Sequence, residues 1–387
     1  MRHRLSGPDG DHLDDALVLW FPAPASFTGE DVAEFHVHGG RAVIEALLGA
    51  LGTLPGSRPA EPGEFTRRAV ENGKFDLTQA EALADLINAE TEAQRKQAFR
   101  QYDGALASLY EGWRARLIGA AAWIEAAIDF SDEEIPGDPV EEAKAQVIEI
   151  ASEINDHLND ARRGEILRDG FHLTVIGPPN SGKSSLINSL ARRDVAIVSD
   201  IPGTTRDVVE VHLDLGGYPV ILADTAGLRE TGDQIEAEGV RRALARAQDG
   251  DAVLLLLDAT KPLQYQGNLA SAPALTVWNK ADLPHAPCEG LSVSVRTGDG
   301  LDNLLQHVGN IVRKRLVTGD VPVLTRERHR HALARAAEAL ERSLAAGELE
   351  IVAEEMRFAM RELGRITGRV DVEDLLDVVF RDFCIGK

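Results

Sequence analysis

The sequence is short of cysteine, of long apolar runs and of positive charge, and each shortage excludes a class of protein. Only two cysteines, Cys288 and Cys384, occur in 387 residues, so we expect no disulfide framework and a reducing, cytoplasmic location. No run approaches the ~20 apolar residues of a membrane span, and the N-terminal MRHRLSGPDGDH lacks the pattern of a signal peptide. We therefore expect no membrane association.

Acidic residues clearly outnumber basic ones. The chain has 63 Asp and Glu against 41 Lys and Arg, which gives a formal net charge of -22. This balance argues against a generally basic nucleic-acid binder, so an RNA partner would have to meet a local basic patch or a partner protein. A hydrophobic content of 44% over this length suits a globular chain of two or three domains.

The chain is organised around residues 172–185, HLTVIGPPNSGKSS. A buried apolar strand precedes residues 177–184, which fit the pattern GxxxxGK[ST] without mismatch. Two glycines let successive backbone N–H groups wrap a phosphate, and the helix that follows adds its positive end. Lys183 can reach the outer phosphates, and the Ser184 hydroxyl can bind magnesium. The strand before and the helix after favour a phosphate-binding loop over an ordinary glycine-rich loop.

Four further stretches extend the phosphate loop into a guanine-nucleotide site. The stretch DTAG at residues 224–227 offers a carboxylate for the water shell of magnesium and a glycine beside the terminal phosphate. Thr205, in the intervening GTTRD, offers magnesium a second hydroxyl. NKAD at residues 279–282 selects the base, because the Asp282 carboxylate can accept two N–H bonds from guanine and adenine lacks that pair. SVR at residues 294–296 offers a backbone N–H to the guanine carbonyl.

The catalytic group is less evident than the binding site. Ras-type GTPases place a water-positioning Gln directly after the glycine of DTAG, and this chain has Leu228 there. An acidic stretch follows, and its carboxylates remain equal candidates: Glu230, Asp233, Glu236 and Glu238. No finger arginine is obvious, although Arg206 and Arg229 are nearby, so a cation or a second subunit would offset the phosphate charge.

The organisation around this site is expected to be α/β plus α. Residues 1–75 resemble a small α/β domain with a polar lead at 1–12, strands at 16–21 and 35–38, and a helix at 42–51. Residues 76–168 are helical, with a capping box at Thr78–Glu81 and one helix from 140 to 167. Residues 169–315 alternate strand and helix, which predicts a mainly parallel sheet with a hairpin at 208–223.

Residues 316–387 are predicted to be helical again, so the sheet domain is inserted between two helical stretches. The segment RERHRH at 326–331 is basic, and one solvated helix face is favoured there over an RNA site. The apolar residues of 372–380 recur at helical spacing before the chain ends in FCIGK.

These motifs together resemble the bacterial tRNA modification GTPases of the MnmE (TrmE) family. The resemblance runs across essentially the whole chain, and its most specific markers lie outside the phosphate loop. They are FTGED at 27–31, HGG at 38–40, PGEFT at 62–66, DLTQAEA at 76–82, IPGTTRD at 201–207 and FCIGK at 383–387.

The resemblance implies a folate-binding N-terminal domain, a helical domain built from both sides of the insertion, and a homodimer joined through the N-terminal domains. It also implies a flavoprotein partner of the MnmG (GidA) type, which carries the FAD. The pair would install an aminomethyl-type group, such as carboxymethylaminomethyl, at carbon five of wobble uridines in tRNA. A tetrahydrofolate derivative would supply the one-carbon unit. Family members carry a further N-terminal segment of strands, which this chain is expected to lack.

Site residues follow from the resemblance position by position. Magnesium would be held by Ser184 and Thr205. Potassium would be held by Asn180, Ser199, Ile201 and Thr204, and the folate by Glu34, Lys74 and Lys387. Glu236 would orient the attacking water, Lys183 would bind the phosphates, and Cys384 would serve the modification, an inert thiol being the alternative. The GTP site would comprise Asn180, Ser181, Gly182, Lys183, Ser184, Ser185, Ser199, Asp200, Ile201, Pro202, Gly203, Thr204, Thr205, Asp224, Thr225, Ala226, Gly227, Asn279, Lys280, Ala281, Asp282, Ser294, Val295 and Arg296.

Two other functions remain open from the sequence. A GTPase switch in ribosome assembly would carry a basic, RNA-binding C-terminal module, whereas this chain is acidic and ends in an amphipathic helix. A scaffold that binds GTP without modifying tRNA is the other alternative.

Overall fold

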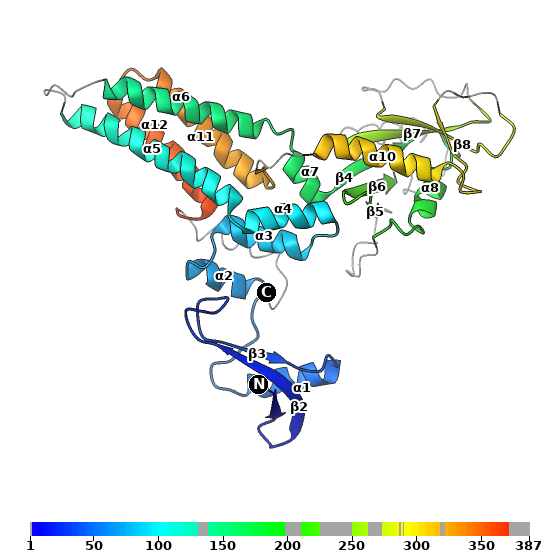
Figure 1. The fold of residues 1–387 in the computed structure, drawn as a ribbon, viewed down its shortest axis with the longest axis horizontal. Helices are drawn as coiled ribbons and strands as arrows, with labels where there is room; N and C mark the ends of the chain where they lie inside the picture. The colour runs from blue at the N-terminus through cyan, green and yellow to red at the C-terminus, as the bar shows by residue number, and fades with distance from the viewer. Residues whose placement is uncertain are drawn as a thin grey trace, which may run out of the picture. The chain divides into compact units, whose positions relative to one another are not determined.

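The computed structural model describes residues 2–130, 138–197, 210–224, 250–261, 273–285, 288, 290–317 and 322–370 (Figure 1). The chain divides into two compact units. The first comprises Met1–Ala84, Gln101–Ser152 and Ala332–Lys387, and the second comprises Asp85–Arg100 and Glu153–His331. This division into two units does not test the four expected domains, which stay a prediction: 1–75, 76–168, 169–315 and 316–387.

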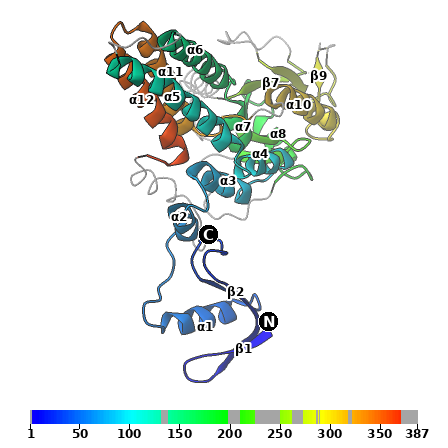
Figure 2. The ribbon, with the colours of Figure 1, turned by 60° about the vertical axis from the view of Figure 1, so that its left-hand side comes forward.

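The first unit begins with a three-stranded antiparallel sheet. Its strands lie in chain order: β1 (Arg2–Ser6), β2 (His12–Phe21) and β3 (Val32–His36). Helix α1 (Arg41–Gly52) lies along β2 (Figure 2). The polar lead expected at residues 1–12 is therefore wrong, since it forms β1 and a tight turn. Gly7 N–H donates to Asp11 O at 2.9 Å across that turn, whose Pro-Asp-Gly sequence is a turn signal.

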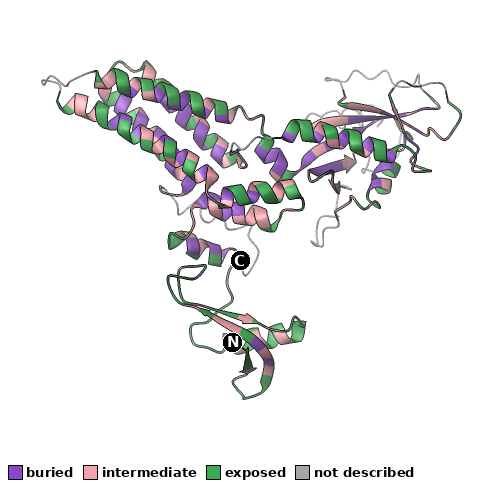
Figure 3. Ribbon diagram, in the orientation of Figure 1, coloured by how far each residue is buried: buried purple, intermediate pink, exposed green. Residues whose placement is uncertain are grey.

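The helices of the first unit bury apolar faces against one another. Helix α5 (Ala105–Asp129) packs against α12 (Leu349–Thr367), and Leu117 and Ile124 of α5 and Met356 of α12 are fully buried. The buried stripe of each long helix is visible in Figure 3. The remaining helices that lie wholly or partly in this unit are α2 (Glu64–Glu71), α3 (Leu77–Ile87), α4 (Glu92–Tyr102), α6 (Pro139–Leu158) and α11 (Glu327–Ala345).

Two expectations about helix ends are wrong. The N-cap of α3 is Asp76, whose Oδ1 accepts from Gln79 N–H at 2.9 Å while Asp76 N–H donates to the Gln79 side chain at 3.2 Å. This reciprocal pair is a capping box two residues before the expected one. The single helix expected from 140 to 167 is two helices, α6 and α7 (Arg163–Asp169), because Ala161 and Arg162 adopt left-handed backbone angles between them.

The second unit contains a six-stranded sheet of order β5-β6-β4-β7-β8-β9. Four strands, β4 (Phe171–Ile176), β7 (Ala252–Asp258), β8 (Leu275–Asn279) and β9 (Leu291–Ser292), run parallel, as β6 (Pro219–Asp224) does beside β4. Strand β5 (Glu210–Asp214) pairs with β6 antiparallel, which confirms the predicted hairpin. The sheet is therefore mainly parallel, as the sequence predicts.

One face of this sheet carries the main core of the unit. Side chains of α8 (Lys183–Leu190) and α10 (Leu301–Leu316) pack on alternate residues of the central strands, including Leu173, Val175 and Leu254. The intervening residues Ile176 and Leu255 form a smaller cluster on the opposite face. Because these strands run parallel, their carboxyl ends and the loops that follow them lie at one edge of the sheet.

Two arginines of the basic segment at 326–331 are engaged in ion pairs, while Glu327 and His331 are exposed, as expected for a solvated face. Arg330 donates to Asp160 at 2.8 Å, to Glu165 at 2.9 Å and to Leu158 O at 2.7 Å. Arg326 forms an ion pair with Asp85. Arg326 and Arg330 are therefore paired with carboxylates within the second unit.

His157 makes the stability of the second unit sensitive to acid. The side chain is buried on α6, and burial lowers the pKa of His157 to about 4, against a small opposing effect of Asp160. Because the folded pKa lies below the unfolded value, the unfolded chain binds the proton more tightly. Stability is complete above about pH 6.5 and declines as pH falls toward 4.

We predict that His157→Gln reduces this acid sensitivity. Between pH 7.5 and pH 5 the imidazole accounts for up to roughly 2 kcal/mol of lost unfolding free energy. Urea unfolding of both proteins at both pH values measures the difference. An equal loss in wild type and variant would show that His157 does not titrate as described.

Candidate guanine-nucleotide site

The phosphate loop connects β4 to α8 and is shaped by two glycines. A Cβ on Gly177 would lie 2.1 Å from Leu256 O of β7, and one on Gly182 would lie 2.3 Å from the Asn279 amide nitrogen. Gly182 is also the N-cap of α8 with a φ of 99°. Both positions therefore require glycine, because neighbouring strands and loops approach the backbone too closely for a side chain.

The start of α8 presents donors suited to an anion. No side chain caps the helix at Gly182, so its first N–H groups point into the loop. Lys183 donates to Gly177 O at 2.9 Å and Pro178 O at 3.1 Å, which folds its ammonium over the loop. Ser184 and Ser185 are exposed in the first turn of α8. These groups can take up phosphate oxygens and a hard cation.

Asn279, at the end of β8, joins three loops of the site. Its side-chain nitrogen donates to Ser181 O at 2.8 Å, and its Oδ1 accepts from Lys280 N–H at 2.8 Å and Val295 N–H at 3.2 Å. The residue is 3% exposed. The phosphate loop, the NKAD loop and the SVR loop are therefore fixed to one another through a single amide.

Asp282 offers a carboxylate toward the base end of the site. Ser294 Oγ donates to its Oδ1 at 2.6 Å, and Arg296 donates to its Oδ2 at 2.5 Å. The Ser294 hydrogen bond, followed by that from Arg296, lowers the pKa of Asp282, so the carboxylate is charged at neutral pH. A charged, oriented carboxylate suits the paired N–H donors of guanine.

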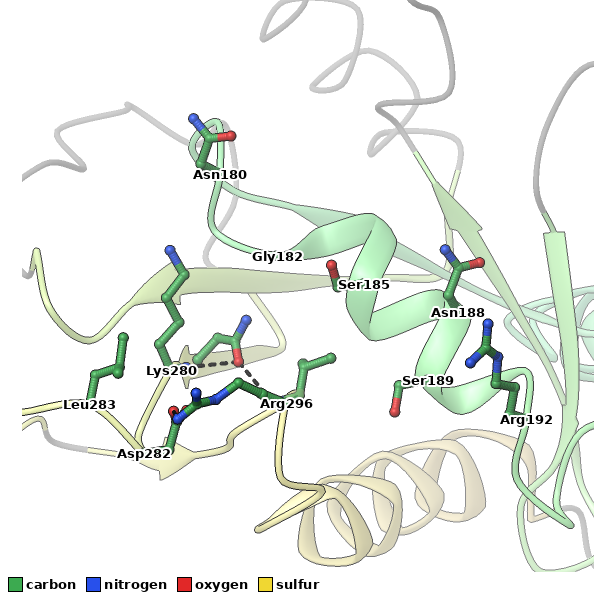
Figure 4. A pocket seen from close by; sticks show the side chains of 12 residues that line it. Asn180, Gly182, Ser185, Asn188, Ser189, Arg192, Lys280, Asp282, Leu283 and Arg296 are labelled. Atoms are coloured by element: carbon green, nitrogen blue, oxygen red, sulfur yellow. Dashed lines mark hydrogen bonds and ion pairs between the residues drawn. The ribbon is translucent and has the colours of Figure 1, made fainter.

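Gly182, Ser185, Asn279, Asp282 and Arg296 line one pocket of about 810 Å³, which Figure 4 shows from close by. It runs from the phosphate loop to the NKAD and SVR loops. Its lining residues are Asn180, Gly182, Ser185, Asn188, Ser189, Arg192, Asn279, Lys280, Asp282, Leu283, Val295 and Arg296. The volume suits a ligand of nucleotide size.

The structure thus brings together the predicted residues of three motifs, at 180–185, 279–282 and 294–296. Asp224 ends β6, the neighbour of β4, as the sequence predicts for a residue after a buried strand. The following site residues lie outside the described residues, and their assignments stay predictions: Ser199, Asp200, Ile201, Pro202, Gly203, Thr204, Thr205, Thr225, Ala226, Gly227, Glu236, Cys384 and Lys387.

Sequence reasoning missed Asp258. This residue ends β7 and accepts an ion pair from Lys280 at 2.6 Å, while Thr260 donates to its other oxygen. Lys280 has a φ of 65°, so the pair holds a strained backbone position in the NKAD loop. The available signal was a carboxylate directly after a buried strand of the same sheet.

The two described folate candidates lie in the first unit. Glu34 is on β3 and contacts His36 at 3.2 Å, whereas Lys74 follows α2 and donates to Pro24 O at 2.9 Å. Each side chain is exposed. Their contacts are with different neighbours, so the folate assignment stays a prediction.

Fold and site together define a P-loop GTPase, in which a phosphate loop and a guanine-selecting carboxylate share one edge of a mainly parallel sheet. The family model described as MnmE helical domain matches residues 77–384, and the model described as GTP-binding protein TrmE N-terminus matches residues 1–74. This chain belongs to the MnmE family of tRNA modification GTPases.

Full-length relatives agree with this membership. A tRNA modification GTPase MnmE of Rhodospirillum rubrum is 57% identical, over 98% of this chain and 86% of its own length. One of Paramagnetospirillum magneticum is 55% identical, over 100% and 90%. Among solved structures, Aquifex aeolicus Era bound to GDP and aluminium fluoride aligns with a TM-score of 0.29 and 24% identity, over 46% of this chain and 68% of that one. That likeness is too weak to add to the assignment. Within the described residues, no helix is long and apolar enough to cross a membrane.

We predict that Asp282→Asn shifts base preference from guanine toward xanthine nucleotides. The amide presents an N–H donor where guanine also has one, whereas xanthine offers a carbonyl there. Competition between GTP and XTP for the purified variant measures the shift, and Asp156→Asn, exposed on α6 and outside the pocket lining, serves as a charge-matched control. Unchanged GTP affinity in Asp282→Asn would remove this residue from the base site.

Proposed function

We propose that this protein hydrolyses GTP in order to install an aminomethyl-type group at carbon five of wobble uridines, together with an MnmG-type flavoprotein. The observation that carries the proposal is the match to proteins named tRNA modification GTPase over nearly the whole chain, on a described guanine-nucleotide site. The chemistry on the uridine would be shared with the partner and its FAD. Work on tRNA implies a cytoplasmic location.

Magnesium and potassium are the expected cations of the site. Ser184, exposed in the first turn of α8 beside Lys183, suits a magnesium ligand next to the phosphates. Asn180 occupies the loop with a φ of 62° and lines the pocket, which suits a potassium ligand at the phosphates. Potassium would neutralise developing charge where an arginine finger is missing, and Glu236 would orient the attacking water.

A homodimer joined through the N-terminal sheet and a folate site there complete the proposal. The support is exposed apolar surface: Leu48 of α1 is 63% exposed and Trp20 of β2 is 61% exposed, and α1 buries none of its residues. Such a surface favours burial against a second copy. Glu34, Lys74 and Lys387 would contact a tetrahydrofolate derivative, and Cys384 would serve the modification chemistry.

The competing role in ribosome assembly lacks support in the described residues. It would use a basic C-terminal surface, and the basic residues Arg326 and Arg330 are engaged in ion pairs within the second unit. A GTP-binding scaffold without modification activity remains the contrasting outcome of the experiment that follows.

We predict that a strain lacking this gene loses the modified wobble uridines. Nucleoside analysis of total tRNA by mass spectrometry measures them, and reintroduction of the intact gene is expected to restore them. A Lys183→Ala gene should fail to restore them, because the phosphates lose their principal cation. Unaltered wobble uridines in the deletion strain would exclude a role in their modification.

We predict also that GTP hydrolysis is faster in potassium than in sodium at equal ionic strength. The reason is the proposed ion at Asn180, and Asn180→Ala should abolish the difference while Mg²⁺ dependence persists. Steady-state phosphate release at saturating GTP measures both. Equal rates in the two salts would contradict the potassium assignment.

A further inference from the structure

The carboxylate that should receive guanine is already occupied by a side chain. Asp282 is recessed, with 11% of its side chain exposed, and its Oδ2 accepts from the Arg296 guanidinium at 2.5 Å. Figure 4 shows the two side chains meeting at the edge of the pocket, and both line it. Guanine therefore has to share or take over an acceptor that the protein itself uses.

The two donors that meet Asp282 differ in how firmly they are held. Ser294 Oγ also accepts from Thr297 N–H at 3.2 Å, and the Ser294 backbone N–H donates to Asp299 O at 2.9 Å, so this hydroxyl is part of the loop. Arg296 extends from the same loop on a long side chain that is 74% exposed. The guanidinium is thus the group that can leave, and its exposed ion pair costs little to break.

The chemistry of the guanidinium and of the base edge is alike. Guanine presents a ring N–H and an amino N–H on one N–C–N unit, which is itself a guanidine fragment. Arginine offers a planar donor of the same kind, and here its Nη2 donates to Asp282 Oδ2 while Ser294 holds Oδ1. Lys280, the other cation of the NKAD loop, is held on Asp258 at 2.6 Å and does not compete.

We propose that Arg296 is a built-in guanine mimic that pairs with Asp282 and is displaced by the base. In this role Arg296 is a positioning and specificity-determining residue. It keeps the recessed carboxylate paired and aligned when no nucleotide is bound, and only a base with paired donors replaces it fully. Adenine, which lacks that pair, leaves the ion pair in place. The inference rests on guanine binding alone, not on the proposed tRNA chemistry.

The experiment is stopped-flow binding of a fluorescent N-methylanthraniloyl GTP to the full chain at constant potassium and magnesium. Arg296→Ala is expected to bind about two- to fivefold faster, because no ion pair must break, with dissociation nearly unchanged. The advantage should shrink as sodium chloride is raised to 0.5 M, since salt weakens the exposed pair of the wild type. Circular dichroism and thermal unfolding verify that the variant is folded.

Two matched variants separate this role from others. Arg192→Ala removes the same charge from another part of the pocket lining and should give no acceleration, because the donors to Asp282 are Ser294 and Arg296. Ser294→Ala removes the donor that stays with the carboxylate and should weaken GTP binding, the opposite direction. Equal or slower association in Arg296→Ala would overturn the proposal, because it would mean that the arginine attracts or holds the bound nucleotide.

Discussion

One buried amide holds the nucleotide site together. Asn279 donates to Ser181 O and accepts from Lys280 N–H and Val295 N–H, so it sets the spacing between phosphate loop and base loops. Gly182 must be glycine because this same amide lies where a Cβ would be. A nucleotide that spans phosphate and base therefore meets a frame whose two ends are fixed before binding, which lowers the ordering cost of association.

The parallel sheet brings Asn279 beside the phosphate loop. It also places cationic and N–H groups where an acidic protein can bind a negatively charged nucleotide. Strands β4, β7 and β8 end at one edge, and the register pairs Asp258 with Asn279 across β7 and β8. The net charge of -22 is spread over the chain, whereas the loop edge holds Lys183 and the uncapped N-terminal end of α8. Local donors within a few ångströms outweigh distant carboxylates that salt screens.

The sequence predicted what short-range spacing determines, and failed where tertiary contacts decide. The phosphate loop, the NKAD loop and the hairpin at β5–β6 follow from residues close in the chain, and the structure confirms their placement. The break before α7 was missed although Asn159 and Asp160 are turn-forming residues, and Ala161 and Arg162 adopt left-handed backbone angles there. Strand β1 was missed because polar residues dominate it and pairing with β2 supplies its stability. The pairing of Asp258 with Lys280 could not be predicted, since the two residues are 22 positions apart in the sequence and meet only through the sheet.

The basic segment at 326–331 shows why charge patterns in a sequence mislead about partners. Glu165 is 4% exposed at its side chain and depends on Arg330 and Arg162, so removing the arginine would leave a buried charge unpaired. The same region holds together the segment that leads into the sheet at β4 and the segment that leaves it after α10. Arg168 donates to Thr325 O at 2.7 Å, and a Cβ on Gly164 would lie 2.1 Å from Leu324 O. Arg330 therefore joins the start of α11 to α7, and Arg326 joins the residue before α11 to Asp85 of α3.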